Sequence, residues 1–176
     1  VALRRLQVTE SLPGVLTNVQ KVTTKDAQLS RDEQGSELIQ LLGLMKYEPA
    51  RETLLKLVPK NSGPVMSRQA AIWTLGHLHA DNVDTALATQ LMRRVNDNQG
   101  MEPEDDLVRY QSIIALGRMK ATAQVGGLRA IAGGQDETSH IGAAARWSIG
   151  QITDTRPAEP PLSPTNVGGW FLEPTN

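Results

Sequence analysis

The chain has 176 residues and a formal net charge of −1, with 18 Lys and Arg against 19 Asp and Glu. This balance argues against a dedicated nucleic-acid-binding protein, which carries a basic excess. The chain contains no cysteine, which excludes disulfides, thiolate zinc sites and cysteine nucleophiles. Aromatic residues make up only 3% of the chain, so we expect an aliphatic core. No apolar run approaches the roughly 18 residues that a membrane span needs.

The first 29 residues predict structure only weakly. Residues 2–7 have the composition of the end of a helix. Ser11 followed by Pro13 is typical of a helix start. The apolar residues around and after it keep helical spacing: Val15, Leu16, Val19 and Val22. Valine and threonine equally suit a strand, so helix and strand both stay open for this segment.

Four segments of the chain align on a glycine. The glycines are separated by 33, 41 and 33 residues and are Gly43, Gly76, Gly117 and Gly150. Around them, small or apolar residues recur in steps of four and three, as on the buried stripe of an α-helix. Shorter segments with helical periodicity follow the first three, at 50–58, 83–95 and 121–131. The sequence therefore predicts long helices, each followed by a shorter partner helix.

Residues that favour helix starts precede the predicted long helices. Ser30 or Asp32 is suited to N-cap the first. Pro64 precedes the second helix. The acidic run 102–106 precedes the third, where negative charge is favourable to the helix dipole. Ser139 is suited to cap the fourth.

The segment 108–119 has the pattern V-R-x-x-x-x-x-A-L-G-x-M. This pattern and its relatives in the other segments resemble the HEAT-repeat family, specifically bacterial repeats of the phycobilisome-lyase type, over roughly residues 30–153. The resemblance implies an all-α, right-handed superhelix, or solenoid, of about four repeats within residues 1–153. Residues 154–176 contain prolines that predict an extended C-terminal tail, at positions 157, 160, 161, 164 and 174.

The resemblance also suggests contacts between repeats. An arginine at the second motif position of such repeats often pairs with an acidic residue of the preceding turn. Arg109 has two aspartates just before it as candidates, whereas Arg68 has no acidic residue in the preceding turn. A glycine within a helix is unfavourable by about 1 kcal/mol relative to alanine. We therefore expect Gly76 and Gly117 to lie at tight helix–helix contacts.

No group of residues predicts a metal site or a catalytic centre. His77 and His79 are two positions apart, so on a helix they point about 200° from each other and cannot bind one ion together. We expect both to face solvent at a helix end. The acidic run 102–106 lacks the alternating ligands and glycine of a calcium loop, which predicts a solvated loop. We expect no metal, no cofactor and no catalytic residues.

Positions three, seven and eleven of each long helix carry the most unusual residues. The resemblance implies that these positions face solvent on the inner, concave surface. Several hold aromatic or apolar residues, and exposed aromatic patches are typical of binding sites. The predicted binding residues are Trp73, His77, Tyr110, Ile114, Arg118 and Trp147. With the register shifted by one, the same residues would be core residues between helix layers, and this alternative stays open.

The tail contains an apolar triplet, Trp170, Phe171 and Leu172. We expect this triplet to dock on the helical domain, because an apolar triplet left in water would promote aggregation. One candidate dock is the ridge of residues 73, 114 and 147, in cis or from another chain. The other is the exposed end of the last long helix, formed by Ile141, Ile149 and Ile152.

These patterns favour a non-catalytic scaffold or adaptor that binds a protein or peptide on its concave face. One alternative is an enzyme or enzyme subunit resembling the phycobilin lyases, which hold a tetrapyrrole. Another is a DNA-binding protein resembling alkylpurine glycosylases, against which the net charge speaks. The sequence does not predict an oligomeric state. It begins at Val1 rather than Met, so both a cytoplasmic and an exported protein are open.

Overall fold

The computed structural model describes residues 9–23, 29–136 and 138–155, with no side-chain description for residues 29–31. Within these ranges the protein is all-α, which confirms the all-α part of the predicted fold class. The α-helices are α2 Leu12–Val22, α3 Leu29–Leu44, α4 Arg51–Leu55, α5 Val65–Leu78, α6 Thr85–Asn96, α7 Asp106–Arg118, α8 Val125–Gly133 and α9 His140–Ile152. Short 3-10 helices are η1 Thr9–Ser11, η2 Glu48–Ala50 and η3 Thr122–Gln124.

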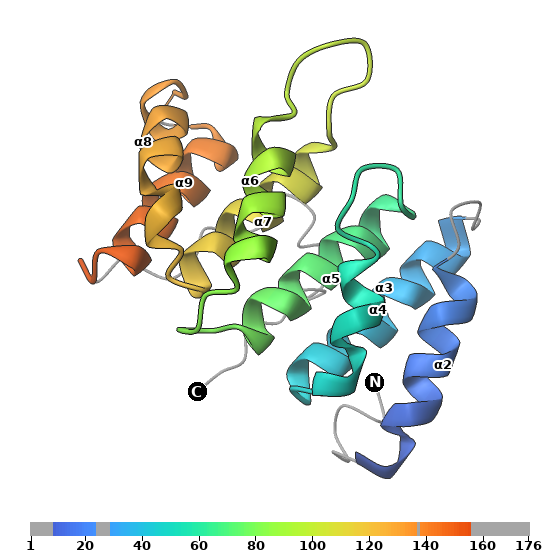
Figure 1. The fold of residues 1–176 in the computed structure, drawn as a ribbon. Coiled ribbons are helices and arrows are strands. Elements are labelled where there is room, and N and C mark those ends of the chain that lie inside the picture. The colour runs from blue at the N-terminus through green and yellow to red at the C-terminus, as the bar shows by residue number, and fades with distance from the viewer. Residues whose placement is uncertain (1–8, 24–28, 137, 156–176) are drawn as a thin grey trace.

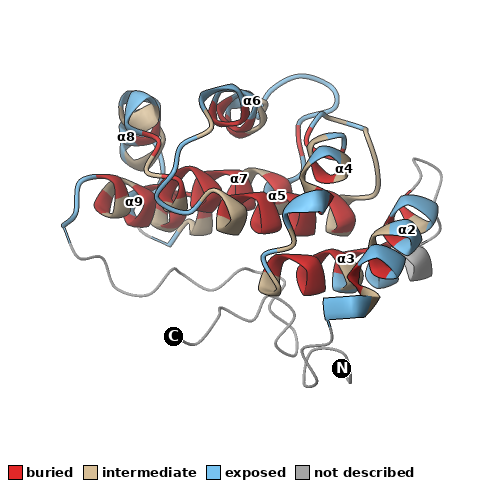
Figure 2. Ribbon diagram, turned by 60° about the horizontal axis from the view of Figure 1, so that its bottom comes forward, coloured by how far each residue is buried: buried red, intermediate tan, exposed pale blue. Residues whose placement is uncertain are grey.

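The long helices α3, α5, α7 and α9 form one row in chain order, each packed against the next (Figure 1). Helices α4, α6 and α8 lie along one side of this row (Figure 2). Each of these shorter helices makes its main contacts with the long helix that follows it, and α2 packs against α3. The sequence predicted that each shorter helix pairs with the long helix before it, so the observed pairing differs from the prediction.

Helix α2 resolves the ambiguity of the N-terminal segment. It begins after Ser11 and carries Pro13 in its first turn, which confirms the predicted helix and excludes the strand. Leu12, Val15 and Val19 are buried. Their spacing of three and four residues forms one apolar stripe, which a helix can lay against α3. The predicted helix end at residues 2–7 lies outside the described residues.

Tight contacts between long helices occur where glycines were predicted to allow them. A Cβ atom on Gly76 would lie 3.0 Å from the Ala115 Cβ, and one on Gly117 would lie 2.8 Å from the Ser148 Cα. Such separations leave no room for a side chain. The prediction of close approach at both glycines is therefore confirmed.

Two hydroxyl groups link neighbouring long helices across these contacts. Thr74 Oγ1 donates to the Ile39 carbonyl at 3.0 Å, and Ser148 Oγ donates to the Ile113 carbonyl at 2.7 Å. Both donors lie two positions before an aligned glycine, and both acceptors lie four positions before one. The α3–α5 and α7–α9 interfaces therefore use the same contact.

The start of α3 differs from the prediction. Because α3 begins at Leu29, Ser30 and Asp32 lie inside the helix and do not cap it. The Asp32 carboxylate instead accepts hydrogen bonds from the backbone N–H groups of Met66 and Ser67, at 3.0 and 2.7 Å. It thus caps α5, which starts directly after Pro64 as predicted. A side chain of one long helix completes the N-terminus of the next.

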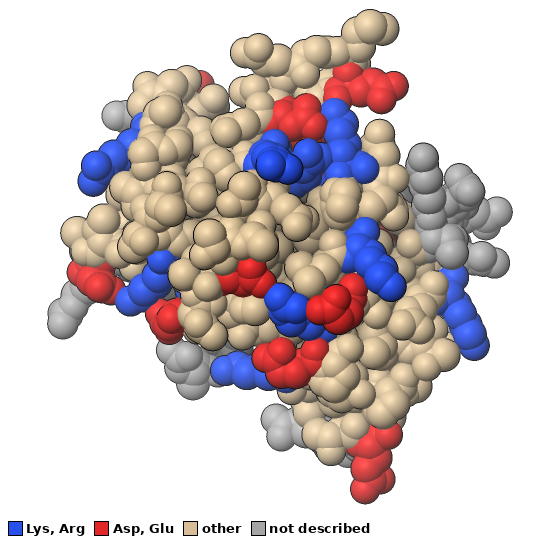
Figure 3. Space-filling view, in the orientation of Figure 1, with Lys and Arg blue, Asp and Glu red and all other residues tan. Residues whose placement is uncertain are grey.

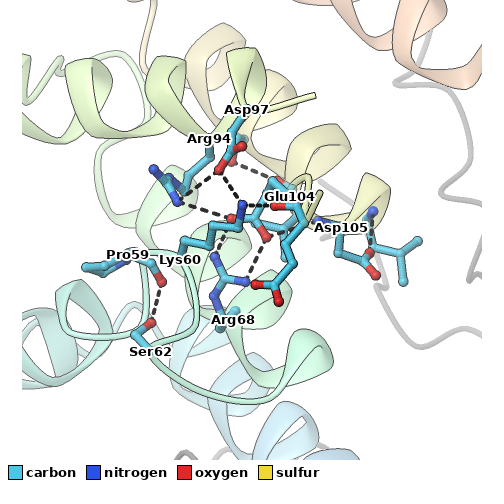
Figure 4. A network of polar contacts seen from close by, with 12 residues as sticks. Pro59, Lys60, Ser62, Arg68, Arg94, Asp97, Glu104 and Asp105 are labelled. Carbon is cyan, nitrogen blue, oxygen red and sulfur yellow. Dashed lines mark hydrogen bonds and ion pairs between the residues drawn. The ribbon is translucent and has the colours of Figure 1, made fainter. Parts of the chain in front are cut away.

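A buried ion pair fixes the loop between α6 and α7. Arg68 on α5 donates from both terminal nitrogens to the Glu104 carboxylate, at 2.8 and 2.6 Å, and Arg94 lies 3.4 Å from the same carboxylate (Figure 4). Burial acts to raise the pKa of Glu104, but the hydrogen bonds and charge of Arg68 outweigh it, and the pKa is lowered. Lys60 joins the network through Asp97 at 3.0 Å.

This network adds one pairing that the sequence did not predict and corrects one expectation. Arg68 has no acidic residue in the preceding turn, and its partner is supplied by a loop 36 residues further along the chain. Glu104 is 4% exposed, so the acidic run is not a uniformly solvated loop. The predicted pairing of Arg109 is confirmed, because its guanidinium lies 2.6 Å from the Asp106 carboxylate. Ser139 caps α9 as predicted, accepting from the Gly142 N–H at 3.3 Å.

The surface on the side of α4, α6 and α8 carries no continuous patch of one charge. Lys and Arg side chains alternate with Asp and Glu side chains across this view (Figure 3). This arrangement matches the near-neutral composition of the chain. Long-range electrostatic attraction of a polyanion needs a field of one sign, and this side does not supply one.

Candidate binding face

The central long helices contact different neighbours on each of their sides. Residues two positions apart on an α-helix point about 200° from each other. In α5, Gly76 faces α7 and Thr74 contacts α3, so these two residues mark opposite lateral sides of the helix. Leu75 and Trp73 therefore mark the remaining two sides.

The Leu75 side faces the layer of shorter helices. Arg68 lies seven residues earlier, almost directly in line with Leu75 along the helix, and it contacts Glu104 in the loop after α6. The Trp73 side therefore faces away from α4 and α6. We call this side, with its equivalents in the other long helices, the long-helix face. Its residues are Gln40, Gln69, Trp73, His77, Tyr110, Gln111, Ile114, Arg118 and Trp147.

The long-helix face thus brings together all six residues that the sequence predicted for binding. It adds Gln111, which the sequence analysis missed. The signal was present, since Gln111 lies three residues before Ile114 and seven before Arg118 and so shares their face. Gln111 lies outside motif positions three, seven and eleven, so the motif pattern did not predict it.

The aromatic side chains of this face are buried, which differs from the open ridge that the sequence predicted. Trp73 is 1% exposed, Ile114 2%, Tyr110 3% and Trp147 8%. They are not core residues between the two layers either, because the shorter helices lie on the opposite side. Part of the burial is lateral: a Cβ on Gly43 would lie 2.6 Å from the Trp73 ring, so that ring covers α3. Their role in binding stays a prediction.

No described helix provides the rest of this burial. Among the elements that the structure describes, the extensive contacts of α5, α7 and α9 are with α3, with each other and with α4, α6 and α8. Yet ten consecutive residues of α5, from Ser67 to Gly76, are buried. A helix in the middle of a two-layer packing normally leaves one side exposed to water. The long-helix face is therefore a covered surface without a described helix on it.

Cationic and aromatic groups lie close together at one end of this face. The rings of Trp73 and His77 are 4.3 Å apart between centroids. The Arg118 guanidinium lies 6.0 Å from the centroid of the Trp147 ring, within the range of a cation–π contact. Burial lowers the pKa of His77 to about 3, and the positive charges of Arg118 and Lys46 act in the same direction. The imidazole is therefore neutral at pH 7.

Neither histidine of the predicted solvent-facing pair is simply solvated. The His77 ring contacts the Trp73 ring at an interplanar angle of 58°, and His79 accepts a hydrogen bond from Arg51 Nε at 3.3 Å. Their side chains take part in different contacts, as expected from their spacing. In the part of the chain that the structure describes, no group of three or more His, Asp or Glu side chains is placed to hold a metal ion.

Several polar groups are buried on the long-helix face. Gln40 Nε2 donates to Ser36 Oγ at 3.3 Å. The nitrogens Gln111 Nε2, Trp147 Nε1 and His77 Nε2 are buried and have no hydrogen-bond partner among the described residues. A buried donor without a partner costs about 1–3 kcal/mol. These groups suit a ligand that supplies hydrogen-bond acceptors.

The two predicted docks for the tail are both largely buried. Ile141 and Ile152 on α9 are buried and Ile149 is half-buried, so this helix end offers little open apolar surface. The docking triplet itself, Trp170, Phe171 and Leu172, lies outside the described residues.

No family model, curated protein or solved structure matches this chain. No described helix has both the length and the apolar character to cross a membrane. The structure itself defines an all-α protein of packed helix pairs, with an aromatic and amide-rich face on one side of its long helices.

Proposed function

We propose that this protein is a HEAT-like, right-handed helical scaffold that binds an extended polypeptide segment on its long-helix face. The aligned glycine contacts and the row of long helices support a repeat architecture in which each pair stacks on the one before. In such an architecture one surface of the row is available to a partner along its whole length.

The observation that carries this proposal is the composition of the long-helix face. Trp73, Tyr110 and Trp147 supply aromatic surface, and Gln111 Nε2 and Trp147 Nε1 have no hydrogen-bond partner among the described residues. Aromatic surface with interspersed hydrogen-bond donors is the chemistry that recognises extended or polyproline-type peptides, whose backbone carbonyls are free to accept. Binding is therefore the function that this composition supports best.

The charges of this face specify the ligand further. Lys46 and Arg118, which lie near enough to lower the pKa of His77, are positive, whereas His77 is neutral at pH 7 and adds no charge. A peptide that carries a carboxylate next to its apolar side chains would pair with the cations and place its apolar groups on the rings. We therefore expect an extended segment with apolar and acidic residues.

The test is selection of phage-displayed random peptides on the immobilised protein. We expect enrichment of peptides that share aromatic or proline residues next to an acidic residue. Arg118→Glu should weaken these peptides about tenfold or more, equivalent to about 1.4 kcal/mol. Arg93→Glu is the matched control, because Arg93 is likewise a basic residue in the last turn of its helix but lies on α6, away from the face.

The selection is also performed on a variant with serine at positions 170, 171 and 172, so that the tail does not mask the result. Failure of both proteins to enrich any shared sequence refutes the proposal. Peptides weakened equally by Arg118→Glu and Arg93→Glu would place the binding site elsewhere on the protein.

A further inference from the structure

We infer that the long-helix face is occupied by the chain's own C-terminal tail, with Trp170, Phe171 and Leu172 lying across the aromatic rings. This inference builds on the proposed function, since it names the segment that the face holds when no partner is present. It makes the tail an internal competitor for the binding site.

The burial of the face is the first observation. Trp73, Ile114 and Tyr110 are at most 3% exposed, although no described helix packs extensively on their side of α5 and α7. The face also buries polar groups, with Gln40 and Gln69 each 1% exposed. Side chains on an uncovered helix face would be open to water. Something other than the described helices therefore covers this surface.

The chain offers only a few segments that could do so. Outside the described ranges are residues 1–8, 24–28, 137 and 156–176. Residues 24–28 connect α2 to α3 and are too short to span the row. Residues 1–8 carry two arginines and no acidic residue, so Lys46 and Arg118 would repel them. Residues 156–176 carry two glutamates and one arginine, which complements those cations.

The composition of the tail also matches the chemistry of the face. Its five prolines restrict it to extended conformations, in which the backbone carbonyls have no internal partners. Those carbonyls are the acceptors that Gln111 Nε2 and Trp147 Nε1 need. The triplet at 170–172 supplies apolar side chains, and Glu173 follows directly with a carboxylate for the cations.

The length of the tail is sufficient to reach the face. Trp170 lies fifteen positions after Thr155, the last described residue. At about 3.1 Å per residue, an extended segment of this length spans about 46 Å. Packed helices lie about 8–10 Å apart, so α5 is about 20 Å from α9 across the row. The excess allows the chain to turn back, and Gly168 and Gly169 are suited to a turn.

A tail in this position lowers the apparent affinity for any external ligand. The apparent affinity equals the intrinsic affinity multiplied by the fraction of molecules in which the face is free. Disabling the triplet should therefore raise the affinity for selected peptides by about tenfold or more, without changing the face itself.

The decisive experiment measures where the tail lies in the full chain. Because the chain contains no cysteine, Val167→Cys provides a single site for a nitroxide label. We expect the label to broaden the indole N–H signals of Trp73 and Trp147 in NMR spectra. The same label in a chain with serine at 170, 171 and 172 should cause no broadening. A label at Gln99→Cys, in the exposed α6–α7 loop, is the control for non-specific effects.

A mixture separates the chain's own tail from that of a second copy. One chain carries the isotope label without nitroxide, and the other carries the nitroxide without isotope label. Broadening in this mixture comparable to that in the doubly labelled chain would overturn the inference in favour of exchange between copies. Absence of broadening in the full chain would overturn it outright.

The outcomes for the two proposals are independent. Broadening by the tail label with no peptide selected by either protein would leave the tail docked but refute the scaffold function. Peptides selected by the unmodified protein, together with no broadening, would refute the tail inference and leave the function standing.

Discussion

Replacing Gly117 with alanine tests the packing that organises the whole row of long helices. A Cβ at this position would lie 2.7 Å from Ser148 Oγ and 2.8 Å from Ser148 Cα. The second of these atoms belongs to the backbone, so a side-chain rotation cannot relieve the contact. Helices α7 and α9 would have to move apart.

Two opposing effects set the expected magnitude. Alanine is favoured over glycine in a helix by about 1 kcal/mol. Overpacking of a tight interface costs about 1–3 kcal/mol. Since the clash at Gly117 involves backbone, we expect the cost to exceed the gain and the free energy of unfolding to fall by about 1–2 kcal/mol. Gly76→Ala, whose Cβ would lie 3.0 Å from the Ala115 Cβ, should have a smaller effect.

The matched control is Gly126→Ala in α8, where no atom lies within 4 Å of the added Cβ. This substitution should stabilise the protein by up to about 1 kcal/mol. Urea unfolding monitored by circular dichroism measures all three variants, with the linear dependence on urea giving the free energies. If Gly117→Ala proved as stabilising as Gly126→Ala, the α7–α9 contact and the alignment of the segments on their glycines would both be wrong.

Three further predictions concern charged groups. Glu104→Gln should lower the free energy of unfolding by about 3 kcal/mol in urea titrations, because it leaves Arg68 buried without its carboxylate, whereas Glu104→Leu combined with Arg68→Met should recover most of this loss. The folded-state pKa of His77, about 3, lies below its ordinary 6.5. As the pH falls below 6.5, His77 binds a proton in the unfolded state but not in the folded state, so the free energy of unfolding decreases, by about 2 kcal/mol at pH 5 relative to its value above pH 7. His77→Gln should remove this decrease. Arg109→Ala should cost about 1 kcal/mol, and an unchanged thermal melt would exclude its pairing with Asp106 as a stabilising contact.

The sequence predicted those parts of the fold that depend on local periodicity. The aligned glycines predicted the positions of the long helices and their close contacts. Glycine is unfavourable inside a helix, so its recurrence there indicates that a neighbouring helix leaves no room for a side chain. Pro64 and Ser139 marked helix starts, because capping depends on residues within one turn. The capping signals act over fewer than five residues.

The contacts that the sequence missed join residues far apart in the chain. Asp32 caps a helix that begins more than thirty residues later, and Arg68 meets Glu104 across 36 residues. Neither pairing has a local signal, because each depends on how one helix pair stacks on the next. The burial of Trp73 was missed for the same reason, since it depends on what lies beside its helix and over it.

The free energy gained by burying the aromatic side chains of the long-helix face favours an occupant on this face. Fully burying an aromatic side chain removes about 150–250 Å² from water, which at about 25 cal/mol per Å² is worth about 4–6 kcal/mol. Trp73, Tyr110 and Trp147 together would then represent more than 10 kcal/mol, which is comparable with the entire stability of a typical domain. The lateral cover over Gly43 accounts for only part of this burial. A protein with this face uncovered would expose much of that surface, and exposed apolar patches of such size mark interaction sites or cause aggregation. Placing two of the three tryptophans of the chain on this side is therefore physically consistent only with a face that is covered, by its own tail or by a partner.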